Sequence, residues 1–154
     1  MSIDARLAEL GIDLPTPAVP VANYVSFVQT GNLVHISGQL SNDASGGIKG
    51  TVGVDVSPEQ ANAAARLCAI NLMAQMKVAC DGDLSRVVRV VKLGGFVQAG
   101  PDFEAIPGVI NGCSDLMVEV FGDAGRHARS AVGVASLPQG VAVEVEAVIA
   151  LTPA

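Results

Sequence analysis

The sequence predicts a single α+β domain in which two helices pack on one face of a β-sheet. Its 154 residues fit one domain that can bury a hydrophobic core. Strand-like runs of apolar residues stand at both ends and in the middle of the chain, and two stretches of helical periodicity lie between them. The expected order is therefore a short helix, a hairpin, a helix, a strand, a second helix and a final hairpin.

Residues 1–22 predict a short helix followed by an extended arm. Ser2 is a suitable N-cap for the helix, and Gly11 is a suitable end. The arm then contains three residues that cannot continue a helix and that favour extended geometry, Pro15, Pro17 and Pro20. We therefore expect a connector that leads into a core over residues 23–154.

The first hairpin is predicted over residues 24–39. Residues 24–29 and 33–39 have the composition of strands, and Gly31-Asn32 between them has the chemistry of a tight turn. Alternation places Val34 and Ile36 on one face and Leu33, His35 and Ser37 on the other. The Gly- and Ser-rich segment 41–53 is expected to be a loop, and its glycines do not form a phosphate-binding pattern.

Two amphipathic helices are predicted in the middle of the chain. Ser57 and Gln60 can form a capping box around Pro58, so the first helix begins there and closes near Gly82. Its apolar face consists of Ala61, Ala65, Cys68, Leu72, Met76 and Ala79. The second helix is expected after Pro107-Gly108 and before residues 122–125, with an apolar stripe formed by Val109, Ile110, Cys113, Leu116, Met117, Val120 and Phe121.

Three further strands complete the predicted sheet. The Val-rich run 86–98 favours a strand, with Gly94-Gly95 as a bulge or bend. Residues 130–137 and 141–151 are expected to pair as a hairpin through a turn at 138–140. The last strand alternates between an apolar face and a mixed face, so we expect neighbouring subunits to cover the mixed face.

Composition argues against several classes of function. The net charge of −6 and the pI near 4.7 disfavour a nucleic acid as main partner, because lysine and arginine supply most of that affinity. No membrane span is expected, since the apolar run 141–151 is short and contains Glu144 and Glu146. The charged N-terminus does not resemble a signal peptide, which favours a cytoplasmic protein. The cysteines show no metal-binding spacing, and we expect reduced, buried thiols at Cys68, Cys80 and Cys113.

One constellation of residues stands out for chemistry. Arg129 is followed at alternate positions by small residues, Ala131, Gly133 and Ala135, which leave room for a ligand beside a guanidinium that can grip a carboxylate. Glu144, on the next strand, could face the same site. The alternative is an ordinary cross-strand salt bridge on a solvated surface. Of the two histidines, His35 is expected to be structural and His127 to lie in an exposed loop.

Both ends of the core resemble the signatures of the RidA-like superfamily, also called YjgF. The C-terminal match is the run Arg-Ser-Ala-Val-Gly-Val-Ala-Ser-Leu-Pro at 129–138 together with Val-Glu-Val-Glu-Ala at 143–147. The N-terminal match is the hairpin from Tyr24 to Ser37, with the same tyrosine-to-serine spacing. The chain departs from many members at Ala22-Asn23 and at Ala131, where they have Gly-Pro and cysteine. It is also longer at its N-terminus and around 106–109, which indicates a divergent subgroup.

The resemblance implies a chorismate-mutase-like fold that assembles into a barrel-like homotrimer with pockets between adjacent subunits. Members that carry the arginine hydrolyse 2-imino acids to 2-oxo acids and ammonia without metal or cofactor. By the same resemblance, Arg129 matches the residue that grips the substrate carboxylate, and Glu144 matches the residue that orients water. The implied pocket-lining residues are Tyr24, Ser37 and Asn111.

Two other functions stay open at this point. The same pocket could capture a small carboxylate metabolite without turnover, or the trimer could serve a protein partner. An endoribonuclease activity, ascribed to some relatives, is disfavoured by the acidic charge and the sparse aromatics.

Overall fold

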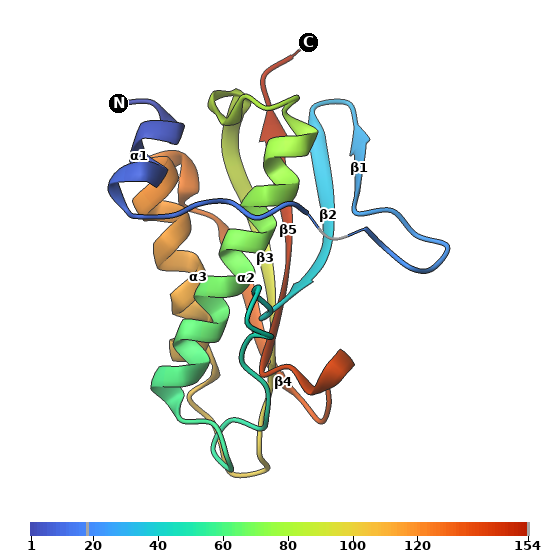
Figure 1. The fold of residues 1–154 in the computed structure, drawn as a ribbon, viewed down its shortest axis with the longest axis vertical. Helices are drawn as coiled ribbons and strands as arrows, with labels where there is room; N and C mark the ends of the chain where they lie inside the picture. Colours follow the sequence, from blue (N-terminus) through green and yellow to red (C-terminus); the bar gives the residue numbers. More distant parts are fainter. Residues whose placement is uncertain (18, 154) are drawn as a thin grey trace.

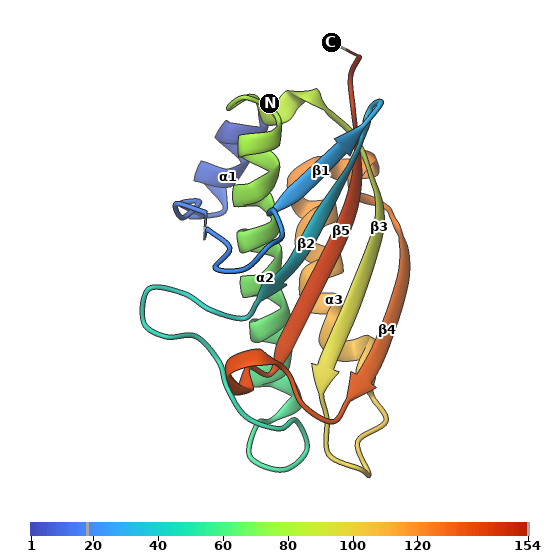
Figure 2. The same ribbon diagram turned by 90° about the vertical axis from the view of Figure 1, so that its right-hand side faces the viewer.

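A computed structural model describes residues 1–17 and 19–153. Helices α2 and α3 cover one face of a five-stranded sheet, and α1 lies beside α3 (Figures 1 and 2). This architecture confirms the predicted α+β class. The elements are α1 (Ile3–Glu9), β1 (Phe27–Thr30), β2 (Leu33–Leu40), α2 (Pro58–Ala79), β3 (Val87–Gln98), α3 (Ile106–Phe121), β4 (Ala128–Val134) and β5 (Val143–Leu151), with short 3-10 turns η1 (Leu84–Arg86), η2 (Gly122–Gly125) and η3 (Pro138–Gly140).

The sheet has the strand order β1-β2-β5-β3-β4. All neighbouring strands are antiparallel except β3 and β4, which run parallel. The predicted N-terminal hairpin is present, but β1 begins at Phe27, so Tyr24 precedes the strand. Val34 and Ile36 face the helices and are buried, whereas Leu33 and His35 are exposed on the other face, as alternation predicts.

The predicted C-terminal hairpin is wrong, because β3 and not β4 is the neighbour of β5. The chain after β4 crosses the end of β3 and inserts β5 into the middle of the sheet (Figure 2). The buried side chain of Gln98 holds this crossing: its Oε1 accepts from the Leu137 backbone N–H at 2.8 Å, and its Nε2 donates to the Gly50 carbonyl at 2.9 Å. The turn at Pro138–Gly140 therefore redirects the chain without pairing its flanking strands.

Helix α2 begins at the predicted capping box. The Ser57 hydroxyl accepts from the Gln60 backbone, and the Gln60 side chain accepts from the Ser57 backbone. Helix α3 begins at Ile106, slightly earlier than predicted, with Pro107 in its first turn, where a missing N–H does no harm. All apolar positions predicted for the two helices are buried, and the three cysteines are buried and free.

Gly94 and Gly95 do not mark a bulge, since the register shifts of β3 lie nearer its start. The two glycines make room on opposite faces of the strand instead. A Cβ at Gly95 would overlap Ile110 of α3, and a Cβ at Gly94 would overlap the side chain of Glu146. Gly95 thus lets α3 approach the sheet, and Gly94 lets Glu146 lie flat on the other face.

The face of the sheet opposite the helices, which we call the outer face, is uncovered in one chain. Val28, Leu33 and Val132 are exposed there among polar and charged side chains. Cover by neighbouring copies stays a prediction. Within residues 1–17 and 19–153, no helix is long and apolar enough to cross a membrane.

Candidate functional site

Arg129 lies on β4 and points toward α3. Its register partner on β3 is Leu93, which is fully buried against the helices, so both side chains are on the helix face of the sheet. The Arg129 Nη1 donates to Asn111 Oδ1 at 2.8 Å and to Ser114 Oγ at 3.2 Å. Asn111 and Ser114 stand one turn apart on the same side of α3. The structure thus brings two predicted residues together, Arg129 and Asn111.

His127 lies in the predicted loop just before β4, but its side chain is half-buried beside Ser114 and not exposed, as the sequence had predicted. Its Nε2 is 2.8 Å from Ser114 Oγ, and its Nδ1 is 2.6 Å from the Gly125 carbonyl oxygen. A carbonyl can only accept, so in the uncharged form of the ring the proton lies on Nδ1 and Nε2 accepts from the Ser114 hydroxyl. We call Asn111, Ser114, His127 and Arg129 the arginine cluster.

The arginine cluster leaves one edge of the guanidinium available. The hydrogen bonds that the Arg129 side chain makes within the described residues all involve Nη1. The edge formed by Nε and Nη2 therefore has no partner there. These two N–H groups form the parallel fork that binds a carboxylate in two hydrogen bonds. Ala131 and Gly133, which follow on the same face, add little bulk, so this edge has room for an anion.

Glu144 lies on the opposite face of the sheet. Its neighbours Val143 and Val145 are fully buried toward the helices, and its own side chain crosses the outer face over Gly38, where a Cβ would overlap the carboxylate. Burial raises the pKa of Glu144, and the nearby charge of Glu146 raises this pKa further. Glu144 is therefore a carboxylate that holds a proton more readily than an ordinary surface glutamate.

Arg129 and Glu144 do not share a site within one chain, which corrects the expectation that they face the same pocket. The register of β3 and β4 puts Arg129 on the helix face together with the buried Leu93. Glu144 lies on the outer face because Val143 and Val145, on either side of it, are buried toward the helices. The edge cavity described next borders β2, and three strand spacings, roughly 14 Å in total, separate β2 from β4. A small substrate cannot span that distance, so one chain presents two separate half-sites.

The second half-site is a cavity of about 550 Å³ at the free edge of β2. It lies beside the part of β2 after Ile36, which β1 does not pair because β1 begins only at Phe27, and residues of the proline-rich arm form part of its wall. Tyr24 and Ser37 line it, together with Gly38 and arm residues such as Pro17. The Ser37 hydroxyl donates to the Val25 carbonyl at 2.7 Å, which ties the segment after Tyr24 to β2. We call this space the edge cavity.

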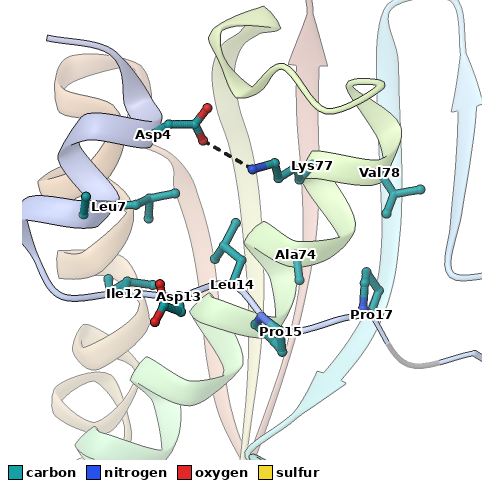
Figure 3. Close-up of a pocket in the computed structure, with 11 residues that line it drawn as sticks. Asp4, Leu7, Ile12, Asp13, Leu14, Pro15, Pro17, Ala74, Lys77 and Val78 are labelled. Atoms are coloured by element: carbon teal, nitrogen blue, oxygen red, sulfur yellow. Dashed lines mark hydrogen bonds and ion pairs between the residues drawn. The ribbon is translucent and has the colours of Figure 1, made fainter.

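Another hollow, of about 460 Å³, lies between α1, the arm and α2 (Figure 3). Leu7, Ile12 and Ala74 form its apolar wall, and an ion pair of 3.4 Å between Asp4 and Lys77 stands at its border. None of the predicted site residues lines it. Its charged groups are exposed to water, so we do not assign it to the candidate site.

Comparison with known proteins places this geometry in a family. A family model described as YjgF/chorismate-mutase-like, "putative endoribonuclease", matches residues 4–146. The chain belongs to this family. It is 50% identical over 151 residues to Protein TCP17 of Trypanosoma cruzi, covering 97% of this chain and 94% of that protein. It is 30% identical over 140 residues to a 2-iminobutanoate/2-iminopropanoate deaminase of Dermatophagoides farinae, covering 91% and 94%.

Several solved structures show the same fold. The protein Atu1372 of Agrobacterium tumefaciens has a TM-score of 0.92 at 48% identity, with 97% of this chain and 92% of that chain covered. A protein of Shewanella oneidensis described as a "putative endoribonuclease" has a TM-score of 0.94 at 31% identity, with 98% and 100% covered. The YjgF gene product of E. coli has a TM-score of 0.62 at 27% identity, with 88% and 93% covered. The lower score agrees with the predicted divergence of this subgroup.

Sequence reasoning about the YjgF signatures missed three residues that shape the half-sites. Ser114 and His127 were not expected to act together, although His127 stands two residues before Arg129 and Ser114 one turn after Asn111. Gly38 follows the predicted pocket residue Ser37 in the sequence. The reason for a glycine there is the Glu144 carboxylate, which a Cβ would overlap and which is distant in the sequence. His35 is exposed on the outer face, and no hydrogen bond to it is found within the described parts of the chain.

The thiols and possible metal ligands add no further centre to the described chain. Burial raises the pKa of Cys113 to about 12, although the charge of Arg129 opposes the shift, and burial also raises the pKa of Cys68. Neither thiol is thereby a ready nucleophile. Over residues 1–17 and 19–153, no group of three His, Cys, Asp or Glu side chains could hold a metal ion.

Proposed function

We propose that this protein hydrolyses 2-imino acids to 2-oxo acids and ammonia in sites that form between adjacent copies of a homotrimer. In each site, Arg129 of one copy would bind the substrate carboxylate. Glu144 of the neighbouring copy would orient and deprotonate water, while its Tyr24 and Ser37 line the pocket together with Asn111. The named activity of the Dermatophagoides farinae relative supports this substrate class.

The observation that carries the proposal is the separation of two complementary half-sites within one chain. The arginine cluster offers an oriented carboxylate fork at the β4 edge, and the opposite edge of the sheet offers a cavity next to a carboxylate. Head-to-tail contact between copies brings unlike edges together, and it forms a closed ring when the rotation between neighbouring copies is one third of a turn. Such a contact unites the fork of one copy with the cavity of the next.

The chemistry asks little beyond placement, because a protonated imine is already electrophilic. Water adds to the imine carbon as Glu144 takes one of its protons. That proton passes to the nitrogen. As the C–N bond breaks, the hydroxyl group gives its remaining proton to Glu144, so the carbon keeps the oxygen as a ketone and ammonia leaves. Ammonia then takes the proton from Glu144, which restores the carboxylate and yields ammonium. A base works best when its pKa lies near the working pH, and burial moves the pKa of Glu144 in that direction. Neither a metal nor an organic cofactor is required.

Replacement of Arg129 tests the proposal. We expect Arg129→Ala to lower kcat/KM by about 100-fold, because two charge-assisted hydrogen bonds to the carboxylate are lost. The measurement is 2-oxo acid release from imines generated by an amino acid dehydratase, with the oligomer checked by light scattering. Arg126→Ala is the matched control, since that side chain is exposed and pairs only with Asp123 among the residues described.

Hydrolysis at the unsubstituted rate by an assembled Arg129→Ala variant would contradict the proposal. Tight binding of 2-oxo acids by the unsubstituted chain, with no turnover of any imine, would favour the non-catalytic carboxylate-binding trimer instead. The net charge of −6 argues against extending the family's endoribonuclease description to this chain.

A further inference from the structure

Ser114 and His127 form a hydrogen-bonded chain that ends on Arg129, and the proposed reaction uses neither of them. We propose that Ser114 and His127 are positioning residues that hold the Arg129 guanidinium in one orientation for a carboxylate-bearing substrate. The inference deepens the proposed function and rests on its assignment of Arg129 as the group that binds the carboxylate.

The hydrogen bonds from Gly125 through His127 and Ser114 to Arg129 run in one direction. The Gly125 carbonyl fixes the proton of the neutral imidazole on Nδ1, so Nε2 accepts the hydroxyl proton of Ser114. With its only proton turned to His127, Ser114 directs lone pairs at the Arg129 Nη1, which lies 3.2 Å away. Without His127, the hydroxyl could rotate and present its proton to the guanidinium. His127 therefore determines that Ser114 is an acceptor for Arg129.

Asn111 and Ser114 together hold one nitrogen of the guanidinium, an arrangement that we call the clamp. Nη1 has two N–H groups, and Asn111 Oδ1 and Ser114 Oγ are acceptors for both. Because the guanidinium is planar, fixing Nη1 also fixes the plane of the Nε and Nη2 fork. The flexible arginine is thus ordered before the substrate arrives, and this preorganisation improves binding.

The clamp is built on regular secondary structure. Asn111 and Ser114 occupy positions i and i+3 of α3, and His127 and Arg129 occupy alternate positions along the path into β4. Helix α3 is anchored in the buried core through Leu116, and β4 pairs with β3 at the fully buried Leu93. A ligand-binding group held from a helix and a strand is placed more reproducibly than one held by a loop.

The test measures affinity for pyruvate and for its uncharged amide, pyruvamide, on the assembled protein by calorimetry. We expect Ser114→Ala to weaken pyruvate binding about tenfold, with pyruvamide unchanged, because a hydrogen bond to a charged group is lost. Ser114→Thr keeps the hydroxyl and should restore binding. His127→Asn keeps a donor near Gly125 but cannot reach Ser114, so it should resemble Ser114→Ala. Asp115→Asn, an exposed neighbour on α3, is the control.

In imine hydrolysis, the same variants should raise KM by about the same factor and leave kcat within about twofold, the signature of lost uniform binding. A merely structural role would lower thermal stability without separating pyruvate from pyruvamide. Unchanged pyruvate affinity in folded Ser114→Ala, or failure of Ser114→Thr to restore it, would overturn the positioning role and leave the proposed function intact. Conversely, weaker pyruvate binding by Ser114→Ala in a protein that hydrolyses no imine would retain the positioning role and remove the hydrolase.

Discussion

The two edges of the sheet differ in how their candidate site residues are arranged. At the β4 edge, four side chains of the arginine cluster hold one another by hydrogen bonds, so a charged group is oriented without a partner copy. At the β2 edge, the important feature is missing side-chain volume: Gly38 leaves room for the Glu144 carboxylate beside the open edge cavity. Hydrogen bonds order the side chains at the β4 edge, whereas the absence of a side chain at Gly38 leaves room at the β2 edge.

Under the proposed function, this difference means that separate parts of one chain bind the substrate and perform the chemistry. Substitutions at the β4 edge should alter how tightly a carboxylate is held, and substitutions at the β2 edge should alter how water is placed. The two effects can then be measured apart, as KM against kcat.

The strongest way to break this comparison is complementation between two inactive variants. Arg129→Ala and Glu144→Gln should each lower activity about 100-fold alone, but a mixed trimer contains interfaces that pair an intact Arg129 with an intact Glu144. Random assembly from equal amounts gives about a quarter of such interfaces, so we expect about a quarter of the unsubstituted activity. The measurement is activity after the two proteins are unfolded and refolded together.

Two controls make complementation decisive. Each variant refolded alone must stay inactive, and the double variant Arg129→Ala with Glu144→Gln must not be rescued by mixing with either single variant. Mixed assemblies that gain no activity, although both chains are shown to be in the same oligomers, would place the complete site within one chain and contradict the two half-sites.

The sequence was sufficient to predict the parts of the molecule whose structure is local. Helix α2 follows from the capping box at Ser57 and from apolar residues at helical spacing, both of which act within a few residues. The faces of β2 follow from alternation in the same way. Arg129 could be singled out because small residues follow it in the strand and because the surrounding run resembles a family signature.

The order of strands could not be predicted locally. Pro138–Gly140 has the composition of a hairpin turn, but whether its flanking strands pair depends on Gln98 and on the strand that occupies the middle of the sheet. The environment of His127 likewise depends on Ser114, a neighbour that only the packing of α3 brings close. Residues whose role depends on distant contacts were therefore misplaced, and the assumed meeting of Arg129 and Glu144 in one chain failed for the same reason.

A smaller effect is expected from adding one methyl group at the β2 edge. In Gly38→Ala the new Cβ would overlap the carboxylate of Glu144, which must then move. Because a small misplacement of a reacting group slows the chemical step, we expect kcat to fall by at least about tenfold, with KM little changed. Steady-state kinetics beside Gly108→Ala, whose Cβ meets nothing within 4 Å, checks the expectation. A rise in KM with unchanged kcat would mean that the β2 edge binds the substrate and does not place water.

The smallest effect concerns the stability of the fold at the same edge. Burial raises the pKa of Glu144 in the folded chain above its ordinary value of 4.5, so the folded state binds a proton that the unfolded state releases more readily. The stability that this proton contributes is present below pH 4.5 and is lost as the pH rises through the raised pKa. Glu144→Gln cannot ionise, so its Tm should exceed that of the unsubstituted chain by about 2 °C at pH 7, and the difference should vanish at pH 4.

Scanning calorimetry between pH 4 and 8 measures the difference in Tm between Glu144→Gln and the unsubstituted chain. Repeating the measurement in an Arg129→Ala background tests whether Arg129 of a neighbouring copy lies near Glu144. If a neighbouring copy places its Arg129 near Glu144, that positive charge lowers the pKa of Glu144, and the difference should be larger in an Arg129→Ala background. Equal differences in both backgrounds would argue that the guanidinium is remote from Glu144 in the assembly. Burial destabilises the charged form of a carboxylate and also makes that carboxylate a stronger base. The loss of stability is therefore expected at a carboxylate whose function is to accept a proton.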